Sequence, residues 1–535
     1  MKWGALLVMA ILACILAFGD SVQSPAPGDS AATSGDTLKI ELGPYPTALN
    51  LRAMIISGRL TPTKVVALSK SRVDEVRRSN TDYGALIGWV TDIDSQLRHL
   101  KTVVPQTAPL YGVPVVVKDN IAIRGEPTTA GSLALRTNIA THDAPVVAAL
   151  RKAGALIIAR TNLSEWANFR DNRSTSGWSS VGGQTGNAYD PSRTPCGSSS
   201  GSAVAVALGY SPVALGTETD GSIICPAAMN GLVGIKPTRQ LISQAGVVPL
   251  AKSQDVVGPM ARTVKDAALL LSVMLKDEHV HRAAAISQAA TKPTQLGQLR
   301  LGIIQNLGHT NRVVNAAFSD LQDKLIKEGV QLIPVTFPGL PQLSKAEIQT
   351  LYFEFQRDLN AYLKAHRNRL PIDSLAALIE YNQVHADRVM PHFGQYRFIQ
   401  ATRIATMSEN SYQVARQLAH KLAGPDGLDR LLKTHQLDAL LAPSNGPAWT
   451  IDYAHGDRYE VGSSSPSAVS GYPAMTIPMT QFEGLPIGVS IMGPQFGDAA
   501  LISLGAAIEA VTGGFVPPKL RQASPQSPRF RQGAP

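Results

Sequence analysis

The sequence is poor in cysteine and contains no motif for binding a metal ion. Only 3 of its 535 residues are cysteine, and one of them, Cys14, lies near the N-terminus. Neither an H-E-x-x-H stretch nor another ligand spacing of that kind occurs. The sequence therefore predicts neither a metal site nor another cofactor.

Long runs of one charge are also missing, although the chain is basic. The formal net charge is +9 and the sequence pI is about 9.4, but no five or six Lys or Arg residues follow one another. An excess that is spread along the chain indicates a solvated basic surface and no nucleic-acid partner. A hydrophobic content of 44% and a charged content of 17% are typical of a globular enzyme.

Histidine is absent from the most distinctive part of the chain, Thr194 to Ala227, so a histidine-based triad is not indicated there. An S-x-x-K motif is missing from the whole chain, which argues against a penicillin-binding protein or β-lactamase. Residues 197–201 satisfy G-x-S-x-G with Ser199 at its centre. The nucleophile elbow of α/β-hydrolases follows a strand directly, however, whereas residues 187–195 read as a loop.

The first 19 residues have the pattern of a secretory signal peptide. Lys2 precedes an apolar run, Gly4 to Phe18, that is shorter than the roughly 20 residues of a membrane span. The small residues Ala17 and Gly19 favour cleavage after Gly19. We expect an exported protein, periplasmic or secreted, with no stable membrane span after cleavage. Lipidation is the alternative, because Cys14 ends a short stretch like a lipobox.

The rest of the chain divides by composition. Residues 20–37 are rich in Pro, Gly and Ser and have little to bury, so they are predicted to be a disordered leader. Residues 517–535 are predicted to be a similar tail. Residues 38–516 read as one catalytic domain. Within it, the segment of about 345–435 is long, polar-faced and helical in pattern, which predicts a helical insert that packs over a sheet.

Apolar strands alternate with helices in most of this domain. Thr61-Pro62 is a good helix start, because Thr caps and Pro suits the first helical position. Further helices are expected at 143–153, 264–275 and 318–328, and buried strands at 113–117, 155–159, 213–215, 232–235, 299–304, 330–335, 437–441 and 487–491. This alternation predicts an α/β architecture with a largely covered sheet.

The stretch from Thr194 to Ala227 contains two turns that are rich in hydroxyl groups. The turns, 197–202 and 217–222, flank a small-residue apolar run at 203–208 and a short strand. Each turn can present backbone N–H groups to an anion. Gly/Ser clusters are often flexible linkers, but Ala and Val follow this one at once, which favours a folded segment.

These two turns carry a family resemblance. The sequences GSSSGS at 197–202 and GTETDGS at 216–222 resemble the signature of the amidase signature hydrolases. The resemblance runs from about Thr47 to about Thr512. It implies an α/β fold with a single large mixed β-sheet covered on both faces by helices. Within the family, the stretches 217–238, 351–367 and 423–443 are most similar to bacterial peptide amidases, which remove the C-terminal amide of peptides.

The resemblance also implies roles for individual residues. Ser222 matches the nucleophile that forms the acyl-enzyme, Ser198 matches the serine that relays protons, and Lys118 matches the base. The backbone N–H groups of the second turn correspond to the oxyanion hole, and two residues of the first turn support the network: Thr219, Asp220, Gly221 and Ser222 for the hole, and Gly197 and Ser199 for the support. A cis peptide between Gly197 and Ser198 is implied as well.

Lysine acts as a base only where burial lowers its pKa toward neutrality. Lys118 stands at the end of the apolar run 113–117, where burial is possible. Each donor of an oxyanion hole is typically worth about 3–4 kcal/mol of transition-state stabilisation.

Two positions depart from the commonest family pattern, since Cys196 and Asp220 stand where glycine is usual. Asp220 is expected either to contact the amide nitrogen of a substrate or to hold the turn. Cys196 and Cys225 lie near the two serine turns. We expect them to be buried thiols, with a disulfide as the alternative in an oxidising compartment.

We therefore expect a serine amidohydrolase that converts a carboxamide to a carboxylate and ammonia, with C-terminal peptide amides as substrates. Small aliphatic or aryl amides are an alternative. A glutaminase-type subunit of a tRNA-dependent amidotransferase is another, which the export signal opposes. A secreted binding protein with an inactive amidase fold is a third, which the intact Lys118, Ser198 and Ser222 oppose. The sequence predicts no particular oligomeric state.

Overall fold

The computed structural model describes residues 43–79, 82–308, 311–404 and 407–520. The expected signal peptide and leader, and all of the expected tail beyond residue 520, lie outside these residues. Within the described ranges, no helix combines the length and the apolar character that crossing a membrane requires.

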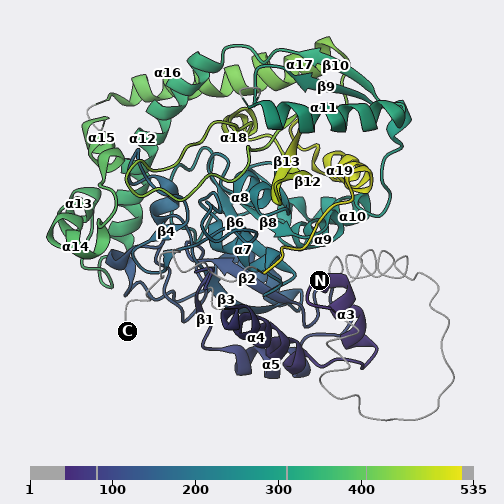
Figure 1. The fold of residues 1–535 in the computed structure, drawn as a ribbon. Coiled ribbons are helices and arrows are strands. Elements are labelled where there is room, and N and C mark those ends of the chain that lie inside the picture. The colour runs from purple at the N-terminus through teal and green to yellow at the C-terminus, as the bar shows by residue number, and fades with distance from the viewer. Residues whose placement is uncertain (1–42, 80–81, 309–310, 405–406, 521–535) are drawn as a thin grey trace, which may run out of the picture.

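A mixed sheet of eleven strands forms the centre of the molecule (Figure 1). From one edge to the other its order is β1-β3-β2-β6-β8-β7-β12-β13-β11-β9-β10. Strand β2 lies between β3 and β6 and is parallel to both, whereas β6 and β8, like β12 and β13, are antiparallel. The strands of this sheet are β1 (Leu86–Trp89), β2 (Pro114–Lys118), β3 (Leu156–Thr161), β6 (Val213–Glu218), β7 (Val233–Lys236), β8 (Val256–Ala261), β9 (Arg300–Ile304), β10 (Gln331–Val335), β11 (Ala439–Pro443), β12 (Ala474–Phe482) and β13 (Leu485–Met492).

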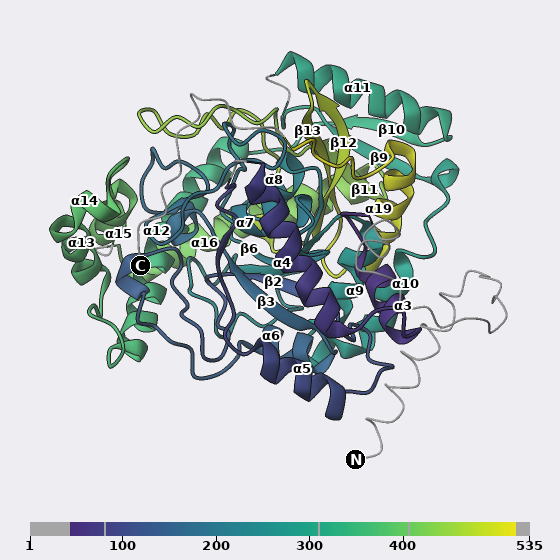
Figure 2. The same ribbon diagram turned by 60° about the horizontal axis from the view of Figure 1, so that its bottom comes forward.

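Helices flank this sheet, as Figures 1 and 2 show from two directions. Helix α7 packs against β2 and β6, whereas α8 packs against β7, β12 and β13. The fold is therefore the predicted α/β architecture. The helices are α3 (Ala48–Ile56), α4 (Pro62–Arg78), α5 (Ile93–Thr102), α6 (Pro145–Lys152), α7 (Ser200–Ala207), α8 (Ile224–Met229), α9 (Val264–Val273), α10 (Ala283–Ala289), α11 (Arg312–Lys327), α12 (Leu340–His366), α13 (Leu375–Val384), α14 (Ala386–Val389), α15 (Tyr396–Ile404), α16 (Glu409–Ala423), α17 (Arg430–Thr434), α18 (Ser465–Ser470) and α19 (Asp498–Thr512).

Local sequence signals explain how several elements begin. Helix α4 starts at Pro62, and the hydroxyl of Thr61 accepts a hydrogen bond of 3.2 Å from the backbone N–H of Lys64. The apolar face of α4, with Val66 and Val73 among its residues, is buried. Each such valine stabilises the fold by roughly 1.5–3 kcal/mol through burial. Helix α7 (residues 200–207) differs from α4, because every one of its residues is buried and no face of the helix is exposed to solvent.

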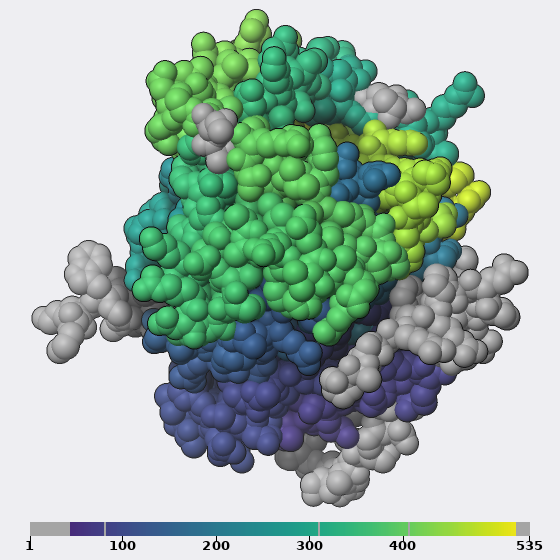
Figure 3. All heavy atoms as spheres, turned by 90° about the vertical axis from the view of Figure 1, so that its left-hand side faces the viewer, coloured from purple at the N-terminus to yellow at the C-terminus, as the bar shows by residue number. Residues whose placement is uncertain are grey.

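Helices α12 to α17 make up the expected insert and follow one another in the chain. Together they form much of one face of the molecule. Figure 3 shows this face, where the green residues of the insert lie over blue residues from the first half of the chain. Phe355 and Phe398 of the insert stack at 5.4 Å between ring centroids, and Phe398 meets Trp166 edge-on at 6.0 Å. Phe169 packs on Phe355 at 5.1 Å. The insert thus has an apolar core that it shares with the loop at 166–169.

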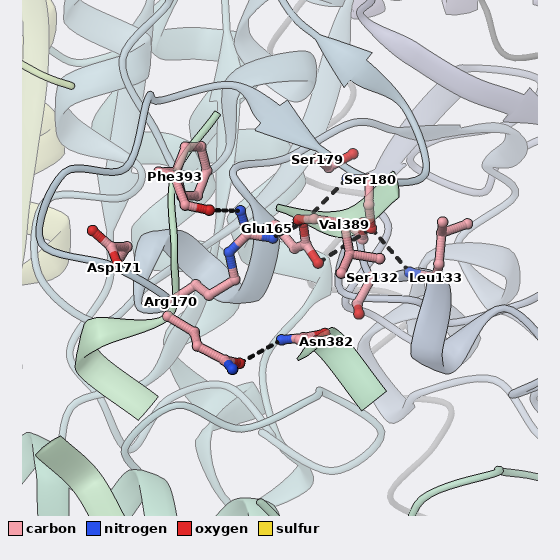
Figure 4. A network of polar contacts seen from close by, with 12 residues as sticks. Ser132, Leu133, Glu165, Arg170, Asp171, Ser179, Ser180, Asn382, Val389 and Phe393 are labelled. Carbon is pink, nitrogen blue, oxygen red and sulfur yellow. Dashed lines mark hydrogen bonds and ion pairs between the residues drawn. The ribbon is translucent and has the colours of Figure 1, made fainter. Parts of the chain in front are cut away.

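A buried ion pair fixes the same loop to the insert (Figure 4). Arg170 donates to Glu165 at 2.8 Å, and both side chains are fully buried. Arg170 also donates to the backbone carbonyls of Val389 and Phe393, which belong to the insert. Glu165 in turn accepts hydrogen bonds from the backbone N–H and the hydroxyl of Ser180. One guanidinium therefore joins two segments that are more than 200 residues apart.

Arg170→Met is expected to lower the free energy of unfolding by about 3–5 kcal/mol, because it leaves the Glu165 carboxylate buried without its cation. Thermal unfolding and urea titration measure the change. The exposed Arg430→Met is the matched control, with an expected effect within about 0.5 kcal/mol. Equal stability of the two variants would contradict the importance of the pair.

Candidate active site

The site lies where two parallel strands end. Lys118 is the last residue of β2 and Glu218 is the last residue of β6. Because the carboxyl ends of neighbouring parallel strands meet at the same edge of a sheet, the two residues and the loops that follow them lie together. Helix α7 packs against both strands, and the turn at 197–199 leads directly into it.

Lys118 is fully buried and faces hydroxyl groups. Its Nζ lies 2.7 Å from Ser198 Oγ, 2.8 Å from Thr217 Oγ1 and 3.2 Å from the Thr217 carbonyl oxygen. Burial lowers the pKa of Lys118 to about 7, although the negative charges of Asp255 and Glu218 oppose that shift. The amine therefore carries a proton only part of the time at neutral pH, as a base must.

The turn that carries Ser198 has unusual geometry. The peptide bond between Gly197 and Ser198 is cis, as the family resemblance implied. A Cβ atom at Gly197 would overlap the Ser164 hydroxyl, so glycine is required at this position. Ser199 holds the turn against β6, because its hydroxyl donates to the Thr217 carbonyl at 3.0 Å and accepts from the Thr217 N–H at 3.2 Å.

Ser222 lies beside this pair in the second turn. Its carbonyl accepts a hydrogen bond of 3.2 Å from the Ser199 N–H, which joins the two turns. Among the described residues, the Ser222 hydroxyl has no hydrogen-bond partner, and Ser222 lines a pocket together with Gly197. The structure thus brings Lys118 and Ser198 into contact and places Ser222 in the adjoining turn.

The second turn also presents the N–H groups that were predicted to form an oxyanion hole. In the part of the chain that the structure describes, the N–H groups of Thr219, Asp220, Gly221 and Ser222 have no acceptor. The Glu218 carboxylate closes the turn by accepting from the N–H groups of residues 223 and 224, at 2.7 and 2.9 Å. Four N–H groups without partners in one loop suit an anionic oxygen.

Two neighbours hold Thr219 in place. Its hydroxyl donates to the Asp255 carboxylate at 2.6 Å, and its carbonyl accepts from Gln254 at 3.2 Å. Burial raises the pKa of Asp255 to about 7, and the hydrogen bonds that it accepts oppose this shift.

Asp220 holds the turn, which is one of the two roles that the sequence left open. Its Oδ2 accepts a hydrogen bond of 2.6 Å from Ser465, at the start of α18. Its carboxyl group also meets the carboxyl group of Glu347, a residue of α12. No local pattern in the sequence marks Glu347, because an acidic residue in a polar-faced helical segment usually belongs to the solvent-exposed surface.

Cys196 and Cys225 form a disulfide bond, so the expectation of two buried thiols is wrong. Their Cα atoms lie 5.9 Å apart, within the range that a disulfide spans. The bond joins the segment before the first serine turn to the helix after the second. Both cysteines also line the pocket beside Ser222.

This pocket has a volume of about 670 Å³ and opens beside Ser222. Its wall combines polar and charged side chains with aromatic and aliphatic ones, and the latter include Phe169, Leu250, Ile348, Tyr352 and Trp449. These side chains come from distant segments, including the loop 166–169 and helix α12. Within the described ranges, no group of three or more His, Cys, Asp or Glu residues is arranged to hold a metal ion.

Comparison with known proteins agrees with this geometry. The native peptide amidase from Stenotrophomonas maltophilia superimposes with a TM-score of 0.81 at 39% sequence identity, over 89% of this chain and 98% of that one. A probable amidase of Arabidopsis thaliana is 36% identical over 434 residues, which are 77% of this chain and 78% of the relative. The mandelamide hydrolase of Pseudomonas putida is 31% identical over 491 residues, 87% of this chain and 91% of the relative.

The family model described as Amidase matches residues 75–502, which is most of the chain. The strand ends, both serine turns and most of the pocket lie within this range. The chain therefore belongs to the amidase family and is an amide-hydrolysing enzyme.

Proposed function

We propose that the protein removes the C-terminal amide of peptides with a Ser222–Ser198–Lys118 triad. The contact between the Lys118 amine and the Ser198 hydroxyl, next to a Ser222 hydroxyl without a partner, supports the triad. The size of the pocket beside Ser222, together with the aromatic side chains in its otherwise polar wall, is the observation that carries the choice of substrate. The likeness to a peptide amidase over most of both chains supports it further.

In the proposed first half of the reaction, Ser222 Oγ attacks the carboxamide carbon. Its proton passes to Ser198 Oγ while the proton of Ser198 passes to the neutral amine of Lys118. The negative charge that develops on the carbonyl oxygen is stabilised by the N–H groups of residues 219–222. Ser198 then donates a proton to the leaving nitrogen, which departs as ammonia, and Lys118 returns a proton to Ser198.

In the second half, water attacks the acyl-enzyme along the same path. The water gives its proton through Ser198 to Lys118 as the tetrahedral intermediate forms. Collapse of the intermediate releases the carboxylate, and Ser222 regains its proton. Each half of the reaction needs an uncharged lysine at its start, which the lowered pKa of Lys118 provides.

The pocket has far more space than a carboxamide group requires. Ligand pockets of about 300–1,000 Å³ enclose whole drug-sized molecules, and the volume here is about 670 Å³. A side chain next to the scissile amide can lie against Phe169 and Trp449, with the rest of a peptide leading outward. Burying an aromatic side chain there is worth roughly 2–3 kcal/mol.

Ammonia release from a panel of amides tests this choice of substrate. We expect kcat/KM for an amidated dipeptide that ends in Phe to exceed that of the matching dipeptide ending in Gly by about 10–100-fold, since the ring is buried. Mandelamide, a fatty amide and free glutamine complete the panel. Preferred hydrolysis of mandelamide would favour an aryl amidase, and preferred hydrolysis of glutamine would favour a glutaminase.

A further inference from the structure

The carboxyl groups of Glu347 and Asp220 meet beside residues 219–222, which we call the oxyanion loop, and both residues line the pocket next to Ser222. Glu347 is only 7% exposed, and Asp220 Oδ1 is buried. No N–H or hydroxyl donor of the described residues reaches this Oδ1 atom. The carboxyl group of Glu347 interacts with that of Asp220.

Two ionised carboxylates cannot share such a contact, because neither has a proton to donate. One proton between them turns the repulsion into a strong hydrogen bond. Burial and the charge of Asp220 raise the pKa of Glu347 well above its ordinary value. Asp220 accepts from Ser464 and Ser465, and these bonds favour its ionised form. The proton therefore resides on Glu347, which donates to Asp220.

The charged and titratable groups around the pair do not neutralise a second negative charge. Lys236 is the cation that interacts with Asp220, and burial lowers the pKa of Lys236 to about 8. The acids Glu218 and Asp255 also pack around the oxyanion loop, as do the half-exposed Tyr459 and the amine of Lys118. Ionising both members of the pair would thus add charge of the sign that an oxyanion also carries.

Glu347 reaches the oxyanion loop by two routes. Its proton holds Asp220, and its Oε1 accepts a hydrogen bond of 2.9 Å from Gln254. The same Gln254 amide donates to the Thr219 carbonyl. Helix α12 of the insert is therefore linked to two consecutive residues whose N–H groups face the reacting oxygen.

We propose that Glu347 is a positioning residue for the oxyanion hole, and that it positions the loop only while it carries the proton that it donates to Asp220. This rests on the proposed function of the loop as the oxyanion hole. Loss of the proton at alkaline pH breaks the hydrogen bond and places a second negative charge next to the oxyanion loop. Deprotonation of Glu347 then causes the fall of activity on the alkaline side, whereas deprotonation of Lys118 causes the rise on the acid side.

Glu347→Gln tests the proposal, because glutamine can donate to Asp220 and accept from Gln254 without a proton to lose. The profile of kcat against pH is measured for each enzyme relative to its own maximum. We expect the wild-type rate to fall about tenfold per pH unit on the alkaline side, and the Gln variant to stay within about twofold of its maximum over the same range. Glu347→Ala is expected to lower kcat by about 10–100-fold at the pH of the wild-type maximum and to lack the alkaline limb, with KM changed much less.

Glu354→Gln is the matched control. Glu354 is a second buried acid of α12, it accepts from Tyr412 and from the Ser253 N–H, and it does not line the pocket. Its variant is expected to keep the alkaline limb of the wild type. An alkaline limb that persists unchanged in Glu347→Gln would overturn the proposal.

Two readouts do not depend on the identity of the substrate. The rate at which a fluorophosphonate labels Ser222 should show the same alkaline limb and the same response to Glu347→Gln. In the infrared difference spectrum of wild type minus Glu347→Gln at neutral pH, the band of a protonated carboxyl group should remain, because the contribution of Asp255 cancels; absence of this difference band would also overturn the proposal. If the band and the labelling behave as expected while no peptide amide is cleaved, the choice of substrate fails and the role of Glu347 stands.

Discussion

Ser222→Ala is expected to lower kcat for amide hydrolysis by about 10⁴–10⁶-fold, because it removes the oxygen that attacks the carboxamide carbon. The N–H groups of the loop, the pocket and the Lys118–Ser198 contact all remain. Binding should therefore survive, and calorimetry with an amidated dipeptide should give nearly the affinity of the wild type. Labelling by a fluorophosphonate should disappear.

Ser411→Ala is the control for this variant, because Ser411 lies exposed on α16 and its loss should leave turnover within twofold. Turnover of Ser222→Ala within a hundredfold of the wild type would reject Ser222 as the nucleophile. In that case Ser199 would be tested next, since it is the serine of the G-x-S-x-G pattern. Its hydroxyl, however, already bonds to the backbone of Thr217.

Lys118→Met is expected to lower kcat/KM by about 10²–10⁴-fold, the usual contribution of a general base. The pH dependence should change as well. In the wild type, protonation of Lys118 below its pKa of about 7 removes the base. The rate should therefore rise about tenfold per pH unit up to that value and reach a maximum before the alkaline fall that we assign to Glu347. The rise should be absent from the methionine variant.

Lys421→Met is the control, because the Lys421 side chain is 67% exposed and does not line the pocket. It should keep both the rate and the rise with pH. A Lys118→Met enzyme within tenfold of the wild type would reject lysine as the base. So would a wild-type profile that is flat from acid to alkaline pH.

The sheet could be predicted in large part from local patterns. Continuous apolar runs are typical of strands that are buried on both faces, and the run at 113–117 corresponds to the fully buried strand β2. Strands β1, β8 and β12 were not expected from the sequence. Strand β1 has only four residues, and β8 and β12 contain Pro259 and Pro478 respectively. Proline within a run argues against a central strand, since it cannot donate to the ladder. Tertiary packing overrides that signal here.

The candidate site could be predicted only where its residues belong to a contiguous motif. The two serine turns and the end of β2 are recognisable from their sequence, and the structure brings them together. Glu347 and Trp449 reach the same pocket from distant segments, and no local pattern sets their positions. Nor could the spacing of Cys196 and Cys225 decide between thiols and a disulfide, because their separation in space depends on how the two turns pack.

Burying Lys118 has a thermodynamic cost for the whole protein. The unfolded chain binds a proton at this amine below a pH of about 10.5, whereas the folded chain binds it only below about 7. The penalty is therefore absent above pH 10.5, grows as the pH falls to about 7 and is constant below that. By linkage it amounts to about 4–5 kcal/mol near neutrality, before the hydrogen bonds of the amine are counted. Lys118 therefore lowers the stability of the fold while it supports turnover. A form of this enzyme that no longer needs activity could replace the lysine with an apolar side chain and become more stable.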